Sequence, residues 1–174
     1  MKEEQPYPDH PDRFDHYCHL LCREGLTGRC YWEVEWEGMV HVAVTYRGIR
    51  RSGTSINSKF GAKDGSWSLS CCDGGYSVWN NSKETSISSP SSSPFSSPSS
   101  SPFSSPSSSS PPVSHRVAVY VDHPAGSLSF YSVSSDSLIH LHTFNTTFTE
   151  EPLHPGLGFG YWSSSGSSVS LCSV

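Results

Sequence analysis

The sequence predicts an all-β fold, a sandwich or barrel built from short strands. In most segments apolar residues alternate with polar ones at a period of two, which is typical of strands with one buried face. Gly, Pro and Asp separate these segments at short intervals. No segment carries an apolar stripe at helical spacing over more than about three turns. Many short strands separated by such turn-forming residues indicate an all-β domain.

The first two strands are predicted at 31–37 and 40–46. In the first, Trp and Val alternate with three glutamates, so the glutamates are expected to face solvent. In the second, three valines and a tyrosine share one face. Gly38 lies between the two segments as a turn residue, which predicts a hairpin. The apolar faces consist of Trp32, Val34, Trp36, Val40, Val42, Val44 and Tyr46.

Six further strands follow, each marked by alternating apolar residues. They are predicted at 67–71, 76–78, 117–121, 128–130, 138–144 and 169–171. Turn-forming residues connect two of these pairs, at Asp73–Gly75 and His123–Gly126. Trp67 falls on an apolar face and is expected in the core with Trp32 and Trp36. Cys71 and Cys72 are interpreted as a buried thiol beside a surface thiol.

A Ser/Pro repeat interrupts the strands. From Ser88 the sequence reads SSPSSSPF twice and then SSPSSSSPP. Such a segment has almost nothing to bury, so residues 86–112 are predicted to be disordered. Phosphorylation before proline or binding to a proline-recognition module are possible roles. The favoured interpretation is an expanded surface loop, since closure entropy grows slowly with loop length.

Composition narrows the classes of partner. The net charge is −5, and the densest basic stretch holds only Arg47, Arg50 and Arg51, so no nucleic-acid binding is expected. No apolar run approaches the roughly 20 residues that span a bilayer, so no membrane contact is predicted. The segment 1–12 is polar and cannot be the apolar part of a signal peptide. A cytoplasmic location is therefore predicted, with the six cysteines as free thiols.

No enzyme, cofactor or metal site is predicted. The sequence has no Gly-x-Ser-x-Gly elbow and no glycine-rich phosphate loop. Glu33 and Glu35 lie side by side on one strand and cannot flank a bond across a cleft. The segment 16–22 holds two His and two Cys in one compact cluster, whereas structural zinc takes two separated ligand pairs. His140 and His142 are expected on one strand face without a third ligand.

Three stretches resemble a known family, the PRY-SPRY domain. GRCYWEVE at 28–35, within the longer run 13–36, resembles the junction at which the SPRY part opens. VAVYVDHPAGSLSFYSV at 117–133 and the closing run from 148 to 172 resemble its later strands and its end. The resemblance is greatest to fish tripartite-motif, NLR-type and stonustoxin-like proteins. It implies a bent, concanavalin-like jelly roll of two antiparallel sheets, with residues 13–174 forming part of PRY plus SPRY around the insert.

The resemblance also implies how the domain works. Family members bind partner proteins through variable loops on one side of the sandwich, which correspond here to 47–60, 70–79 and 159–162. Trp79 is expected to point opposite to Val78, and packing of the loop tryptophans beneath their own loops is the alternative. The candidate partner-binding residues are Arg50, Arg51, Ser70, Cys72, Trp79, Phe159, Tyr161 and Trp162.

Two roles follow from the resemblance. The first is a recognition module at the C-terminal end of a tripartite-motif or NLR-type innate-immunity protein, binding a protein partner. The alternative is the C-terminal assembly domain of a stonustoxin-like pore-forming protein. Both are binding functions without catalysis.

Overall fold

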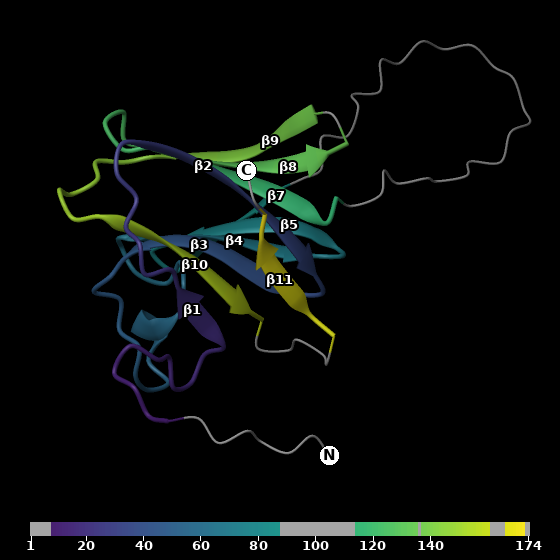
Figure 1. Ribbon diagram of the computed structural model, residues 1–174. Coiled ribbons are helices and arrows are strands. Elements are labelled where there is room, and N and C mark those ends of the chain that lie inside the picture. The colour runs from purple at the N-terminus through teal and green to yellow at the C-terminus, as the bar shows by residue number, and fades with distance from the viewer. Residues whose placement is uncertain (1–7, 88–113, 136, 161–165, 173–174) are drawn as a thin grey trace, which may run out of the picture.

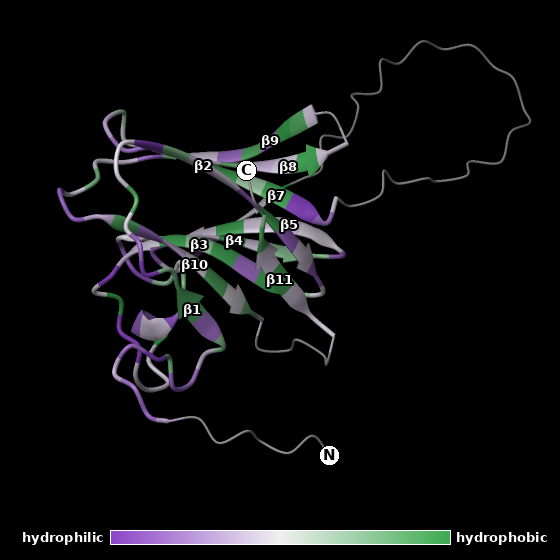
Figure 2. Ribbon diagram, viewed as in Figure 1, coloured by the Kyte–Doolittle hydropathy of each residue, from purple (hydrophilic) through white to green (hydrophobic). Residues whose placement is uncertain are grey.

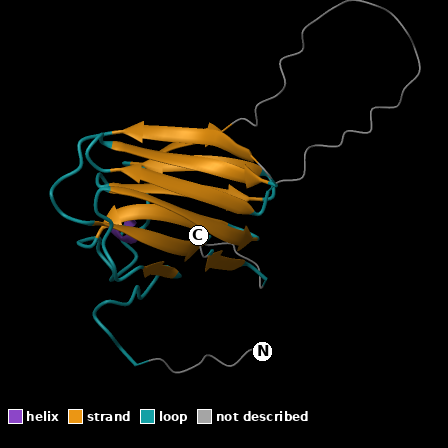
Figure 3. Ribbon diagram, turned by 45° about the horizontal axis from the view of Figure 1, so that its top comes forward, coloured by secondary structure: helices purple, strands orange, loops and turns teal. Residues whose placement is uncertain are grey.

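The structure is a computed structural model that describes residues 8–87, 114–135, 137–160 and 166–172. In this part of the chain eleven strands form two antiparallel sheets, which lie as two layers (Figure 1). One short 3-10 helix, η1 at Ile56–Ser58, lies among the loops at one end (Figure 3). No helix within the described ranges is long and apolar enough to span a membrane. The predicted all-β sandwich is confirmed.

One layer is a six-stranded sheet in the order β1-β10-β3-β4-β5-β6. Its strands are β1 (His19–Leu21), β3 (Val40–Tyr46), β4 (Ser66–Cys72), β5 (Gly75–Asn80), β6 (Lys83–Ile87) and β10 (Leu153–Phe159). The other layer is a five-stranded sheet in the order β11-β2-β7-β8-β9. Its strands are β2 (Arg29–Glu37), β7 (Arg116–Asp122), β8 (Ser127–Ser134), β9 (Ser137–Asn145) and β11 (Ser168–Leu171).

The main core lies between the two layers. Trp36 and Phe130 of one sheet pack with Leu69 and the β3 valines of the other, and all are almost completely buried. Trp67 is also buried, and Trp32 packs against this core while remaining partly exposed. Apolar residues are spread over the strands of both layers, whereas the loops near the N-terminal segment are mostly polar (Figure 2). The predicted apolar faces therefore meet each other across the sandwich.

The predicted hairpin between β2 and β3 is wrong. The two strands belong to different sheets, and the chain crosses from one layer to the other at Gly38. A two-residue hairpin here would set Glu35 opposite Val42, and directly opposed residues share a face. The tryptophans would then lie on the face away from the valines. Crossing between layers buries both apolar faces against each other, which a hairpin cannot do.

This crossing makes Gly38 sensitive to substitution. Its φ is +79°, and a Cβ added there would lie 3.1 Å from the Cα of Ser167. Gly38→Ala is expected to lower the free energy of unfolding by about 1–2 kcal/mol, because an L residue is strained at that φ. Gly48→Ala is the matched control, since nothing lies within 4 Å of its added Cβ. Urea unfolding of both variants checks this, and equal stability would contradict the strain.

A second, smaller core lies on the outer face of the six-stranded sheet. Phe14 and Phe60 pack there against Ala43 of β3, with ring centroids 5.8 Å apart. Gly156 of β10 leaves space for Phe60, since a Cβ at this glycine would lie 2.7 Å from the ring. This core fastens the N-terminal segment to the sheet.

Three strands of the six-stranded sheet carry no alternating signal, namely the three-residue β1, β6 and β10. β10 reads LHPGLGF, and its Pro155 and glycines resemble a loop, yet it pairs with both β1 and β3. β6 carries charged and polar residues because both of its faces are largely exposed. β6 also extends to Ile87, so Ser86 and Ile87, predicted to be disordered, are paired in a strand. Residues 88–112 of the predicted insert lie outside the described residues.

Candidate functional site

A groove of about 460 Å³ opens on the outer face of the six-stranded sheet. We call it the Trp79 groove. The residues of the sheet that line it include His41, Ser70, Cys72, Ser77 and Trp79. The strand register explains why these residues line the same groove, because Ser70 is the direct partner of both His41 and Ser77. Partners in adjacent strands share a face, so these polar side chains point away from the main core. Tyr17 and His19 from the N-terminal segment and β1 form another wall.

Trp79 presents an aromatic surface within this groove. It follows the buried Val78 on β5, and its partner Ser68 shares the outer face with Ala43, as predicted from strand alternation. The ammonium of Lys59 lies 4.6 Å from the centroid of the indole ring. This is the geometry of a cation–π contact, which holds the half-buried ring in place. A fixed, partly exposed tryptophan is typical of an interface hot spot.

Two histidines line the groove in their neutral form. Burial, with a smaller contribution from the nearby Lys59, lowers the pKa of His41 to about 4. Burial and then the proximity of His41 lower the pKa of His19 to about 3. His41 Nδ1 is hydrogen-bonded to the Ser70 hydroxyl at 2.8 Å. Near neutral pH these rings therefore add apolar and hydrogen-bonding surface but no charge.

An aromatic stack supports this wall. The His19 ring stacks on the Phe60 ring with centroids 4.0 Å apart. The Tyr17 ring also stacks on that of His19, with centroids 5.3 Å apart. His19 lies beside Gly158 of β10, where any Cβ would collide with the imidazole. The glycines of β10 thus allow the N-terminal segment to approach the sheet closely enough to complete the groove.

The structure brings together four of the predicted partner-binding residues. Ser70, Cys72, Trp79 and Phe159 all line the Trp79 groove. Arg51 does not; it lies in a separate hollow, where its guanidinium is bonded to Asp12. Arg50 is exposed in the same loop. Tyr161 and Trp162 lie outside the described residues, and the proposed contact role of all eight residues stays a prediction.

Sequence reasoning missed Tyr17, His41 and Lys59 as groove residues. His19 was considered only as a metal ligand. The available signal was the position of His41 between two core valines on β3, which forces its side chain to the outer face. Lys59 lies within the loop 47–60 that the family resemblance had indicated, although it was not named there. Tyr17 carried no such signal, because only the packing of the N-terminal segment around Phe60 places it there.

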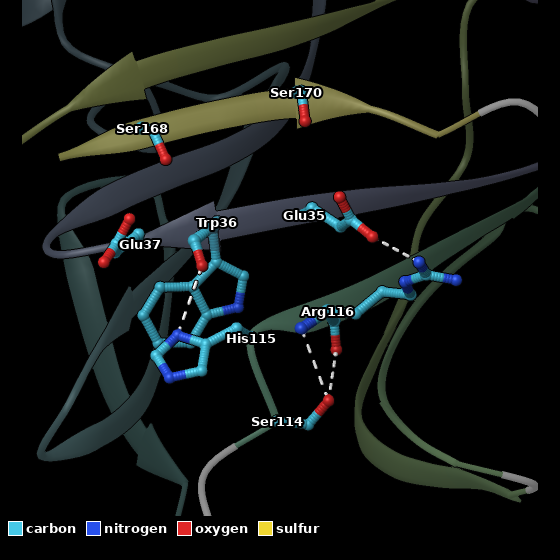
Figure 4. Close-up of a pocket in the computed structure, with 8 residues that line it drawn as sticks. All are labelled: Glu35, Trp36, Glu37, Ser114, His115, Arg116, Ser168 and Ser170. Atoms are coloured by element: carbon cyan, nitrogen blue, oxygen red, sulfur yellow. Dashed lines mark hydrogen bonds and ion pairs between the residues drawn. The ribbon is translucent and has the colours of Figure 1, made fainter.

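A second hollow of about 430 Å³ opens where β2 and β11 approach the start of β7 (Figure 4). Its one guanidinium group is already paired with glutamates. The guanidinium of Arg116 bonds to Glu33 at 3.3 Å and to Glu35, both on β2. His115 packs against Trp36 and shares a hydrogen bond with its carbonyl at 3.2 Å. The residue Ser114, which follows the predicted insert, lines this hollow rather than the Trp79 groove.

Potential metal ligands remain apart in the described ranges, where no three His, Cys, Asp or Glu side chains form a metal-binding group. The predicted same-face arrangement of His140 and His142 is wrong. A β-bulge sets them opposite Tyr131 and Phe130, successive residues of β8. Successive strand residues point to opposite faces, so the bulge separates the two imidazoles.

The chain matches a family model over most of its length. The model described as SPRY domain covers residues 29–172. The chain belongs to the SPRY family. A second model, the SPRY-associated domain, or PRY, covers residues 1–26, and this range includes the predicted polar segment 1–12. SPRY domains are non-catalytic domains that bind proteins.

Individual relatives confirm the resemblance to stonustoxin-like and tripartite-motif proteins. Neoverrucotoxin subunit alpha of Synanceia verrucosa is 40% identical over 90% of this chain and 20% of its own length. Tripartite motif-containing protein 16 of Mus musculus is 34% identical over 84% of this chain and 23% of its own length. The stonustoxin structure superposes with a TM-score of 0.74 at 35% identity, covering 97% of this chain and 24% of that one. The SPRY chain thus spans about a fifth to a quarter of these relatives.

Proposed function

We propose that this SPRY domain is a recognition module whose protein partner inserts an apolar or aromatic side chain into the Trp79 groove. The observation that carries the proposal is the indole ring of Trp79, fixed by Lys59 and bordered by the neutral imidazole of His41. Burying such a ring against a partner contributes strongly to affinity, and the serines around it can align the partner's backbone by hydrogen bonds. Ser70, Cys72 and Phe159 form the remaining contacts.

The longer protein to which this domain would belong, its parent protein, is a separate question. Sequence identity supports a stonustoxin-like parent protein better than a tripartite-motif or NLR-type one. Identity to neoverrucotoxin subunit alpha is 40%, against 34% to tripartite motif-containing protein 16. In a toxin-like parent the same groove would serve assembly with another protein chain. A role in innate immunity and a cytoplasmic location stay predictions.

The groove is tested by selecting peptides from a random library on the wild-type chain. Selected peptides are expected to carry an apolar or aromatic residue and to bind Trp79→Ala at least about tenfold more weakly. Trp79→Phe, which keeps a ring, should retain most of the affinity. Tyr31→Ala is the control, because Tyr31 is an exposed aromatic residue of the other sheet.

Thermal melting of each variant separates lost binding from lost folding. Peptides that bind wild-type and Trp79→Ala chains equally would overturn the assignment of this groove. Concentration-dependent self-association in sedimentation velocity, abolished by Trp79→Ala, would identify assembly rather than recognition of a foreign partner.

A further inference from the structure

Four arginines from three segments of the chain converge beside the N-terminal segment. Arg13 precedes β1 and Arg23 follows it, while Arg47 and Arg51 lie in the loop after β3. Together they line a hollow of about 300 Å³, which we call the arginine pocket. Asp12 is the one carboxylate among the described residues that line it.

This concentration of charge contrasts with the rest of the molecule. The chain has eleven lysines and arginines against sixteen acidic residues, for a net charge of −5. Four of the eleven basic side chains nevertheless surround one small hollow. Within the arginine pocket four guanidinium groups surround one carboxylate, and a concave wall concentrates their field, which favours an anion there. Asp9 and Asp15 line an adjoining hollow that shares Arg13, Arg47 and Arg51.

The pocket already holds a carboxylate of its own chain. Arg51 Nη1 lies 2.6 Å from Oδ1 of Asp12, and it also donates to the Asp12 main-chain carbonyl at 2.9 Å. Arg47 Nη2 lies 3.8 Å from the other carboxylate oxygen. The carboxylate remains more than half exposed, so water screens these contacts. Asp12 therefore demonstrates the geometry of anion binding without saturating the pocket.

The arginines differ in how firmly they are held. Arg51 has a side chain only 13% exposed, and its guanidinium lies 5.8 Å from the centroid of the Phe14 ring. It forms a rigid base for the pocket. Arg47 is 59% exposed, and Arg23 is exposed at the rim. Guanidinium groups present paired N–H donors that match carboxylate and phosphate oxygens, so these two can engage an external anion.

We infer that the arginine pocket is a second docking site, which binds an acidic segment of a protein partner through carboxylate or phosphate groups. A confined hollow suits a single anionic side chain, whereas a nucleic acid needs an extended basic surface. The acidic remainder of the molecule would be repelled by an anionic bilayer as well. The pocket and the Trp79 groove share none of the residues that line them, so this inference stands or falls independently of that groove.

The test measures binding of three labelled peptides to the full chain by fluorescence anisotropy. One peptide is rich in glutamate, the second carries phosphoserine in place of the glutamates, and the third carries glutamine. Variants are the double substitution Arg23→Gln with Arg47→Gln, and separately Asp12→Asn, which removes the internal competitor. Arg29→Gln is the matched control, because Arg29 is 71% exposed and paired with Asp122 elsewhere.

The anionic peptides are expected to bind, and the glutamine peptide is not. The double substitution should weaken binding about tenfold or more, and Asp12→Asn should strengthen it several-fold. Added salt should weaken binding in every case. Binding of only one anionic peptide identifies whether carboxylate or phosphate is the preferred group.

Three results would overturn the inference. The first is no binding of either anionic peptide, even to Asp12→Asn. The second is an equal loss on Arg29→Gln, which would indicate a diffuse charge effect. The third is stronger, arginine-dependent binding to vesicles that contain phosphatidylserine, which would assign the pocket to a membrane instead. Because Trp79→Ala leaves the pocket intact, failure here is distinguishable from failure of the Trp79 groove.

Discussion

Phe60→Ala is expected to lower the free energy of unfolding by about 3–5 kcal/mol, the usual cost of deleting a buried phenylalanine ring. Phe60 is 2% exposed and contacts Phe14, stacks on His19 and fills the space above Gly156. Removing the ring leaves a cavity beneath the N-terminal segment. For a domain of this size we expect the melting temperature to fall by about 10 °C.

The loss should be local as well as global, because Phe60 fastens one segment to the sheet. Trypsin is expected to cut Phe60→Ala faster at Arg13 and Arg23, on either side of β1, than at sites in the strands of the main core. The Trp79 groove should then lose the wall formed by Tyr17 and His19. Ile56→Ala is the control, since Ile56 lies in the adjacent η1 and is 57% exposed. Uniformly faster cleavage at all sites would show that Phe60 stabilises the whole domain and does not anchor the N-terminal segment in particular.

The free energy of unfolding is expected to fall steeply as the pH drops from about 6.5 toward 4. Burial lowers the pKa of His19 to about 3 and that of His41 to about 4, whereas the unfolded chain has the ordinary value of 6.5. Between these values the unfolded state binds more protons, so acid favours unfolding. The stabilisation is fully present above pH 6.5 and is lost toward the folded-state values. By pH 5 the loss is on the order of 1–2 kcal/mol per histidine.

Urea unfolding at pH 7, 6 and 5 measures this dependence. His19→Gln and His41→Gln should each flatten the pH profile, because glutamine takes up no proton. His140→Gln is the control, since His140 is exposed on the edge strand β9. Identical slopes for the wild type and all three variants would show that neither groove histidine controls acid stability.

These two predictions describe one structural unit. Phe60 and His19 stack upon each other, and the rings of His19 and His41 meet edge to face with centroids 6.3 Å apart. The N-terminal segment therefore does not merely cover the sheet. It supplies a wall of the Trp79 groove on one side and arginines of the arginine pocket on the other.

Strand alternation predicted most of the sandwich because burial on one face dictates a period of two. It located β2, β3, β4, β5, β7, β8, β9 and β11, and it placed Trp36 and Trp67 in the core. The same rule also predicted that Trp79 points away from Val78. β10 could not be predicted this way. Its Pro155 and glycines are selected by close contact with β1, β3 and the ring of Phe60, which are distant in sequence.

The path of the chain between β2 and β3 shows the limit of local reasoning. Gly38 is a turn residue in either a hairpin or a crossing between layers, and its identity does not distinguish them. The choice depends on which apolar faces must meet, and that is a property of both sheets together. Comparing the expected partners, Glu35 with Val42, would have indicated the crossing.

The sequence by itself determined the fold class, the SPRY resemblance and the outward direction of Trp79, because each depends on residues close together in the chain. Only the tertiary structure decided that Ser70, Cys72, Trp79 and Phe159 share a groove with His19 and His41, while Arg51 belongs to a separate pocket. The physical reason is that both sites form where the N-terminal segment packs on the six-stranded sheet. That contact is set by Phe14, Phe60 and the glycines of β10, which no local pattern connects.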